Sequence, residues 1–205
     1  MSFAEIFNKE FPHKLHSSIE NPFDKELRCC YDAVAVFCYD NDFTPNHITT
    51  ISLICGVICC YTLYKKIKYA PAIFYFLCYF FDGVDGYYAR KYDMVTEFGD
   101  WYDHVKDVSV HLGIIYILYL QKRYEGILLV ALLFLFATIH LGCQENLFAR
   151  SKPDFNHSST LHQCQKMCPL DENTIHDGIL LTKYWGTGTL TFFMVLYLAL
   201  VNNKI

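Results

Sequence analysis

The sequence predicts an all-α membrane protein: a polytopic bundle of about five to six transmembrane helices, preceded by an N-terminal interfacial helix. Composition is the first support for this fold class. Hydrophobic residues make up 53% of the 205 residues and charged residues only 19%, below the roughly 25% that is typical of soluble domains. A chain of this length suits one folding unit, so we expect a single membrane domain over residues 1–205.

The second support is the spacing of charged residues along the chain. Three segments of about 20 residues, 43–64, 126–144 and 184–203, contain no Asp, Glu, Lys or Arg. A helix of about 20 residues rises about 30 Å, which is the thickness of the hydrocarbon core of a bilayer. We therefore expect each of these segments to be a transmembrane helix.

Two shorter apolar segments lie next to aspartates. Residues 69–81 and 108–121 are uncharged, but a helix of that length covers only about 20 Å. Each can cross the bilayer only if the helix includes the aspartates at its end. Four carboxylates then lie at one end of two adjacent membrane helices, those of Asp82, Asp85, Asp103 and Asp107. Because ionisable groups are costly in a membrane, we expect them to face a polar cavity and bind a ligand.

The remaining segments are expected outside the hydrocarbon core. In the N-terminal segment 1–42, residues 29–39 are apolar but too short to span, which favours a helix lying along the membrane surface. This segment has no charged start followed by an apolar core, so it does not resemble a secretory signal. Residues 145–183 are polar and contain two prolines, which predicts a loop outside the bilayer.

Charge and cysteine usage argue against a nucleic-acid-binding protein and against a secreted, disulfide-rich protein. The net charge is −4 and the pI is about 6.1, so the chain lacks the basic field that holds nucleic acid. Several of the ten cysteines lie in apolar segments, where a thiol behaves as a small hydrophobe, and we expect no secreted disulfide framework. The polar loop holds a further cluster whose spacing matches no familiar zinc module: His157, His162, Cys164 and Cys168.

The four aspartates form two pairs. Asp82 and Asp85 are three residues apart and share one helix face. Asp103 and Asp107 are four residues apart and do the same on the next helix. Carboxylate oxygens suit Mg²⁺ or Mn²⁺ rather than zinc, and without cations four crowded carboxylates would repel one another. The pattern therefore predicts a site for divalent cations.

Glycines and an arginine accompany the aspartates. Gly86 and Gly99 lack side chains where a ligand or a second helix must approach closely. Arg90 can contact a phosphate through two parallel hydrogen bonds. Divalent cations, close-approach glycines and a phosphate-binding arginine together indicate phosphoryl chemistry.

These residues resemble the signature of the CDP-alcohol phosphotransferase family, D-x2-D-G-x2-A-R-x8-G-x3-D-x3-D. All of its fixed positions are filled with every gap correct, by Asp82, Asp85, Gly86, Ala89, Arg90, Gly99, Asp103 and Asp107. The run Pro45-Asn46-His47-Ile48-Thr49 also resembles the Pro-Asn-x-x-Thr start of the first span in many members. The resemblance covers residues 44–110 well, whereas the C-terminal half matches only in being apolar and helical.

The resemblance implies an integral membrane enzyme of phospholipid synthesis. The hydroxyl of an alcohol attacks the β-phosphorus of a CDP-linked donor, which releases CMP and forms a phosphodiester. In this family the four aspartates hold a pair of divalent cations, Mg²⁺ or Mn²⁺, that clamp the diphosphate. Carried over by position, the metal ligands are Asp82, Asp85, Asp103 and Asp107.

The resemblance also implies roles for single residues. Asp103 and Asp107 would be catalytic, with Asp107 as the general base for the acceptor hydroxyl. The nucleotide would lie against further residues of the signature and of the first span: Gly86, Ala89, Arg90, Asn46, Thr49, Thr96 and Gly99. A homodimer is implied as well. In a eukaryote we expect the endoplasmic reticulum, with the active site facing the cytoplasm, although the charge asymmetry that supports this orientation is small.

Two substrate pairs remain open. One is CDP-diacylglycerol with a small polar alcohol such as inositol, glycerol phosphate or serine, and the compact size of the chain resembles members of this group. The other is CDP-choline or CDP-ethanolamine with diacylglycerol. The Asp103-His104 pair resembles the Asp-His of that second group. We favour the first pair slightly.

Two other classes of protein also place carboxylates in membranes. An intramembrane prenyltransferase holds Mg²⁺-diphosphate with aspartates, but it would not need the Gly86-Ala89-Arg90 element. A divalent-cation carrier would transport metal without depending on a cytidine nucleotide, and Arg90 beside its site would be a poor choice. Release of CMP distinguishes both from the favoured enzyme.

Overall fold

The computed structural model describes residues 20–151, 161–170 and 174–202, and within these ranges it is helical without strands. The α-helices are α2 (Pro22–Asp40), α3 (Pro45–Tyr64), α4 (Ala70–Lys91), α5 (Glu97–Leu120), α6 (Tyr124–Ser151), α7 (Ile175–Thr182) and α8 (Thr187–Val201). Two short 3-10 helices, η1 (Leu161–Met167) and η2 (Lys183–Trp185), lie before and after α7 in the chain. The predicted all-α fold is confirmed.

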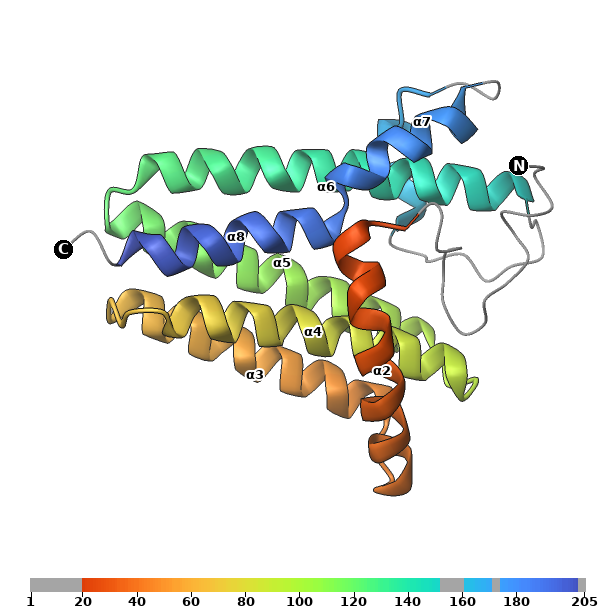
Figure 1. The fold of residues 1–205 in the computed structure, drawn as a ribbon, viewed down its shortest axis with the longest axis horizontal. Coiled ribbons are helices and arrows are strands. Elements are labelled where there is room, and N and C mark those ends of the chain that lie inside the picture. Colours follow the sequence, from red (N-terminus) through yellow and green to blue (C-terminus); the bar gives the residue numbers. More distant parts are fainter. Residues whose placement is uncertain (1–19, 152–160, 171–173, 203–205) are drawn as a thin grey trace.

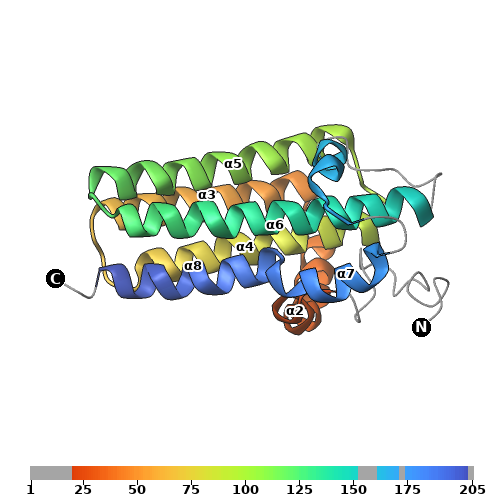
Figure 2. The same ribbon diagram turned by 90° about the horizontal axis from the view of Figure 1, so that it is seen from above.

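Helices α3, α4, α5, α6 and α8 lie side by side in a bundle (Figures 1 and 2). Helix α2 crosses this bundle at a steep angle (Figure 1), as a helix lying along a membrane surface would. Because the connections 65–69, 92–96 and 121–123 are short, successive helices from α3 to α6 run in opposite directions. The end of α4, the start of α5 and the end of α6 therefore lie at the same end of the bundle.

Local sequence signals explain where these helices begin. Asn21 precedes Pro22 and accepts a hydrogen bond from the backbone N–H of Phe23, so α2 starts well before the apolar stretch 29–39. Thr44 accepts from the N–H of His47 and caps α3. The first span of the bundle therefore begins at the Pro-Asn-x-x-Thr run, as that run predicted.

Three segments are long and apolar enough to cross a membrane, by length and composition: Pro45–Tyr64, Tyr124–Leu147 and Asp177–Val201. The third includes part of α7 and η2, because α8 alone has 15 residues and rises only about 22 Å. Helices α4 and α5 have 22 and 24 residues, which is enough to span once their aspartates are included. The described residues hold five bundle helices and no sixth.

Helix α3 contacts both α4 and α5 and so fixes the two aspartate-bearing helices relative to each other. A Cβ atom at Gly56 would lie 2.5 Å from Cγ2 of Val110, which shows how closely α3 approaches α5. The buried core around this contact includes Cys59, Leu63 and Ile114. The tight packing leaves little freedom in the relative register of the three helices.

The segment 145–183 differs in part from the expected polar loop outside the bilayer, since its residues 177–183 belong to the third apolar span. Helix α6 continues to Ser151, and Glu145 on it is only 2% exposed. Ile175 and Ile179 on α7 form an apolar cluster with residues of α6, so that part of the segment folds back onto the bundle. The physical reason is the four-residue spacing of these apolar side chains, which gives the short α7 one apolar face.

The cysteines follow the prediction in part. Cys55, Cys59 and Cys78 are buried free thiols, as expected of small hydrophobes. Cys143 and Cys168, however, are joined by a disulfide that links α6 to the residue after η1. Cys168 is therefore not available as a zinc ligand. His157 lies outside the described residues, and the side chain of His162 is likewise not described.

Candidate metal centre and nucleotide site

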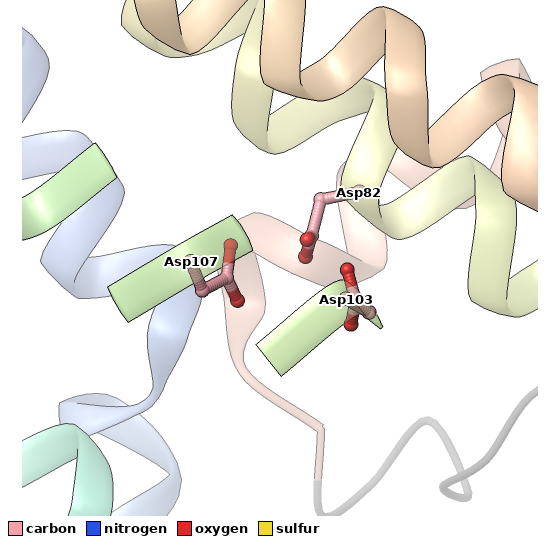
Figure 3. Close-up of side chains that lie close together, drawn as sticks. All are labelled: Asp82, Asp103 and Asp107. Carbon is pink, nitrogen blue, oxygen red and sulfur yellow. The ribbon is translucent and has the colours of Figure 1, made fainter. Parts of the chain in front are cut away.

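Three of the four predicted carboxylates converge between two helices. Asp82 comes from α4, and Asp103 and Asp107 come from successive turns of α5. One carboxylate oxygen of each lies within 4.8 Å of the others. Figure 3 shows the three carboxylates pointing toward a common space. The four-residue spacing on α5 puts two of them on one helix face, and α3 holds α4 at the distance that lets Asp82 reach them.

The side chain of Lys106 lies among these carboxylates. Its Nζ atom donates to Asp103 Oδ1 at 2.9 Å, lies 3.0 Å from Asp107 Oδ1, and also contacts Asp82 Oδ1. The Lys106 side chain is fully buried, whereas those of the three aspartates are 25%, 28% and 42% exposed. The carboxylates thus form the solvent-exposed, open side of the site, and the ammonium group lies on its buried side.

Asp85 is held differently from the other three aspartates. It is buried, and its Oδ2 accepts a 2.7 Å hydrogen bond from Thr49 Oγ1 on α3. Asp85 does not belong to the group whose oxygens lie within 4.8 Å of one another. The structure therefore brings together Asp82, Asp103 and Asp107, while the role of Asp85 as a fourth ligand stays a prediction.

Gly86 and Arg90 are adjacent on one face of α4. A Cβ atom built on Gly86 would lie 3.2 Å from Nη1 of Arg90, which is closer than an ordinary van der Waals contact. The guanidinium therefore folds back over the position where another residue would carry a side chain. Ala89 is half-buried on the same helical turn. This face of α4 combines an arginine with an open backbone, the combination expected for a phosphate contact.

The other candidates for the nucleotide pocket cluster where α3 and α5 begin. Thr96 caps α5 by accepting a 3.0 Å hydrogen bond from the N–H of Gly99. A Cβ atom at Gly99 would lie 3.1 Å from Thr96 Oγ1 and 3.3 Å from Asn46 Oδ1. Asn46 is one turn before Thr49, which bonds Asp85. The signature residues and the Pro-Asn-x-x-Thr residues thus form one continuous polar region.

Lys106 is the residue that the sequence interpretation missed as part of the site. Lys106 is not among the site residues that the sequence predicts. The signal was present, because Lys106 is three residues after Asp103 and therefore shares its helix face. His104, from the Asp103-His104 pair, has its Nδ1 2.7 Å from the backbone oxygen of Asp100 on its own helix. That contact is local and does not by itself assign a role to His104.

The donor set fits a hard divalent cation. It consists of carboxylate oxygens alone, from two helices, with each carboxylate partly exposed on the open side. Oxygen-only sites of this kind suit Mg²⁺, Mn²⁺ or Ca²⁺ rather than zinc. A cation held there would neutralise a diphosphate and withdraw electron density from the phosphorus under attack.

The helical bundle and its carboxylate cluster define a membrane protein with a site that suits a hard divalent cation. The family model of CDP-alcohol phosphatidyltransferases matches residues 42–203, well over half of the chain. The chain therefore belongs to the CDP-alcohol phosphatidyltransferase family, an enzyme family of phospholipid synthesis whose members use divalent metal. The match also extends over the C-terminal helices. No curated protein and no solved structure matches the chain.

Proposed function

We propose that the chain transfers the phosphatidyl group of CDP-diacylglycerol to a small polar alcohol such as inositol, with release of CMP. The observation that carries the proposal is the convergence of Asp82, Asp103 and Asp107 in a chain whose family acts on CDP-alcohols. The matching family model is that of phosphatidyl transfer, which favours CDP-diacylglycerol as the donor. Mg²⁺ or Mn²⁺ is the proposed metal, with two ions per site and Asp85 as the fourth ligand.

The proposed residue roles follow from position and exposure. Asp107 has the most exposed of the three clustered carboxylates, at 42%, which suits a general base that must meet an incoming alcohol. Asp107 would take the proton of the acceptor hydroxyl as its oxygen bonds to the β-phosphorus. The bond from that phosphorus to the bridging oxygen breaks, and CMP leaves with the electron pair. Arg90 would pair with the donor's phosphates, and Asn46 and Thr96 would line the cytidine side. Thr49, predicted for the same pocket, would act through its hydrogen bond to Asp85.

A second function has one specific observation in its favour. The Asp103-His104 pair resembles that of the enzymes that transfer phosphocholine or phosphoethanolamine from the CDP-alcohol to diacylglycerol. In that reaction the same carboxylates would serve, but the lipid would be the acceptor instead of the donor. The two functions therefore differ in substrates and share the metal centre.

The proposed setting is a multi-pass protein of the endoplasmic reticulum, if the organism is eukaryotic, with the carboxylate end of the bundle toward the cytoplasm. The water-soluble alcohol and the departing CMP would exchange with that side. A homodimer is part of the same proposal. It predicts that chemical cross-linking in native membranes yields a band at twice the monomer mass.

The test uses purified protein in mixed micelles with Mn²⁺ and radiolabelled CDP-diacylglycerol. Inositol, serine and glycerol 3-phosphate are added separately, and the radiolabelled lipid product is identified. A phosphodiester product with one of these alcohols supports the first function and names the acceptor. Product only from CDP-choline or CDP-ethanolamine with diacylglycerol supports the second. Failure with every pair would contradict phospholipid synthesis.

A further inference from the structure

Lys106 places a fixed positive charge at the point where the metal ligands converge. Its Nζ contacts one oxygen of each carboxylate, at 2.9 Å for Asp103 and 3.0 Å for Asp107, with Asp82 as the third partner. Mg²⁺ binds carboxylate oxygens at about 2.0–2.1 Å, closer than the ammonium group does. An ion bound to these same oxygens would lie close to the ammonium group and be repelled by it. The two cations therefore compete for the same three carboxylates.

The surroundings of Lys106 explain how a lysine is tolerated there. The side chain is buried, and an ammonium in a low-dielectric site needs compensating negative charge. The three aspartates supply that charge, and Ser52 Oγ accepts a further hydrogen bond from Nζ at 3.3 Å. Ser52 is itself fixed, since its hydroxyl donates to the backbone oxygen of Cys78 at 2.7 Å. The ammonium thus has a neutral acceptor that lies away from the carboxylates' open side.

We propose that Lys106 is a built-in counter-ion of the metal centre, which holds Asp82, Asp103 and Asp107 together without metal and is displaced when a divalent cation binds them. The inference rests on the proposed function only in assigning a divalent metal to this cluster. It concerns metal binding and not the transferred group, so it can be tested without any substrate. Its consequence is that Lys106 weakens the affinity of the cluster for the metal.

The test is a titration of the full-length protein in detergent micelles with Mn²⁺ alone, followed by electron paramagnetic resonance of the free ion. Lys106→Met removes the charge and keeps an unbranched side chain that is one heavy atom shorter. We expect its dissociation constant for Mn²⁺ to fall at least tenfold below that of the wild type, a change of about 1.4 kcal/mol. An unchanged or raised dissociation constant would overturn the proposal.

Lys91→Met is the matched control. Lys91 lies on α4 and pairs with Asp32 at 2.6 Å, outside the carboxylate cluster. Removing its charge should change the dissociation constant less than twofold. A tenfold effect of Lys91→Met as well would mean that net charge, and not the position of Lys106, sets the affinity, and would overturn the proposal.

A second measurement needs only the wild type and covers a Lys106→Met protein that does not fold. In a structure determined with Mn²⁺, the anomalous signal of the ion locates it among the carboxylates. The proposal expects Nζ of Lys106 to have left Asp103 and Asp107 and to keep its contact with Ser52. An ion bound to Asp82, Asp103 and Asp107 with Nζ still in its present contacts would contradict displacement. Neither measurement involves CMP release, so failure of the proposed function would be seen separately.

Discussion

Thr49 Oγ1 donates a 2.7 Å hydrogen bond to Oδ2 of Asp85, and this contact joins α3 to the aspartate-bearing part of α4 across 36 residues of sequence. Both residues are buried. Thr49 belongs to the Pro-Asn-x-x-Thr run, and Asp85 is one of the eight fixed positions of the signature. The bond therefore connects two sequence motifs that lie in different helices, and it gives Thr49 a role in positioning a carboxylate.

Replacing Thr49 by valine keeps the shape of the side chain and removes the donor to Asp85. A buried acceptor without its donor costs about 1–3 kcal/mol, so we expect a lower unfolding temperature in detergent. Thr62→Val is the matched control, because Thr62 is buried on the same helix and its hydroxyl bonds the backbone oxygens of Ile58 and Cys59 within α3. Equal unfolding temperatures for the two variants would contradict the importance of the Thr49–Asp85 bond.

Arg90 is expected to bind the phosphates of the CDP-linked donor. Arg90→Ala should raise the KM for the donor at least about tenfold, since a hydrogen bond to a charged group contributes about 1.5–3 kcal/mol. Lys91→Ala removes the neighbouring positive charge, which pairs with Asp32 instead, and should leave the KM within a factor of about two. The measurement is initial CMP release against donor concentration. A similar rise in KM for both variants would mean that Arg90 has no specific contact with the donor.

Asp24 on α2 should make the docking of this helix depend on pH. Burial raises the pKa of Asp24 from 3.8 to about 7, a shift that a hydrogen bond from Tyr79 opposes and the neighbouring charge of Glu20 reinforces. In the unfolded chain the carboxyl group ionises near its ordinary pKa, so the folded state holds a proton that the unfolded state has lost. The stability that Asp24 contributes is therefore fully present below pH 4 and is lost as pH rises toward 7.

Asp24→Asn isolates this contribution. The asparagine cannot ionise, so the variant should lose less stability than the wild type between pH 5 and pH 8. A shift of this size corresponds to at most about 4 kcal/mol over the full titration. The measurement is the unfolding temperature of both proteins across that pH range. Parallel pH profiles would show that Asp24 ionises in the folded state as it does in the unfolded chain.

The Cys143–Cys168 pair tests the orientation of the bundle. The two sulfurs are bonded in the structure, at the same end as the carboxylates. If that end faces the cytoplasm, glutathione keeps both cysteines reduced in the cell, and the disulfide forms only on oxidation of the isolated protein. Cells are therefore quenched with acid and alkylated with a mass-tagged maleimide before and after reduction. No additional tagging after reduction supports the cytoplasmic orientation, whereas two protected cysteines would place this end in an oxidising compartment.

The sequence predicts the parts of this protein that depend on local spacing. Helix lengths follow from uncharged segments, and the pairing of Asp103 with Asp107 follows from the helical repeat. The convergence of Asp82 with that pair was expected because both helices needed their aspartates in order to span. These features rest on one-dimensional patterns, and the structure agrees with them.

Other features depend on contacts between helices that no spacing reveals. Lys106 could be assigned to the face of Asp103, but its burial against Asp82 depends on how α4 and α5 are placed by α3. The separation of Asp85 from the other carboxylates depends on Thr49 in the same way. The disulfide between Cys143 and Cys168 forms because η1 packs against α6. The polar composition of the segment gave no indication of this packing.

The measurement that tests the central claim most directly is metal-dependent release of CMP from CDP-diacylglycerol by the wild type, Asp107→Asn and Asp100→Asn. Asp100 lies on the same helix but outside the signature and the carboxylate cluster. With Mn²⁺ and the accepting alcohol present, we predict that Asp107→Asn loses about 10²- to 10⁴-fold in rate, as expected for removal of a general base. Asp100→Asn should retain most of the activity. Equal activity of all three proteins, or CMP release that persists when the metal is chelated, would contradict the account.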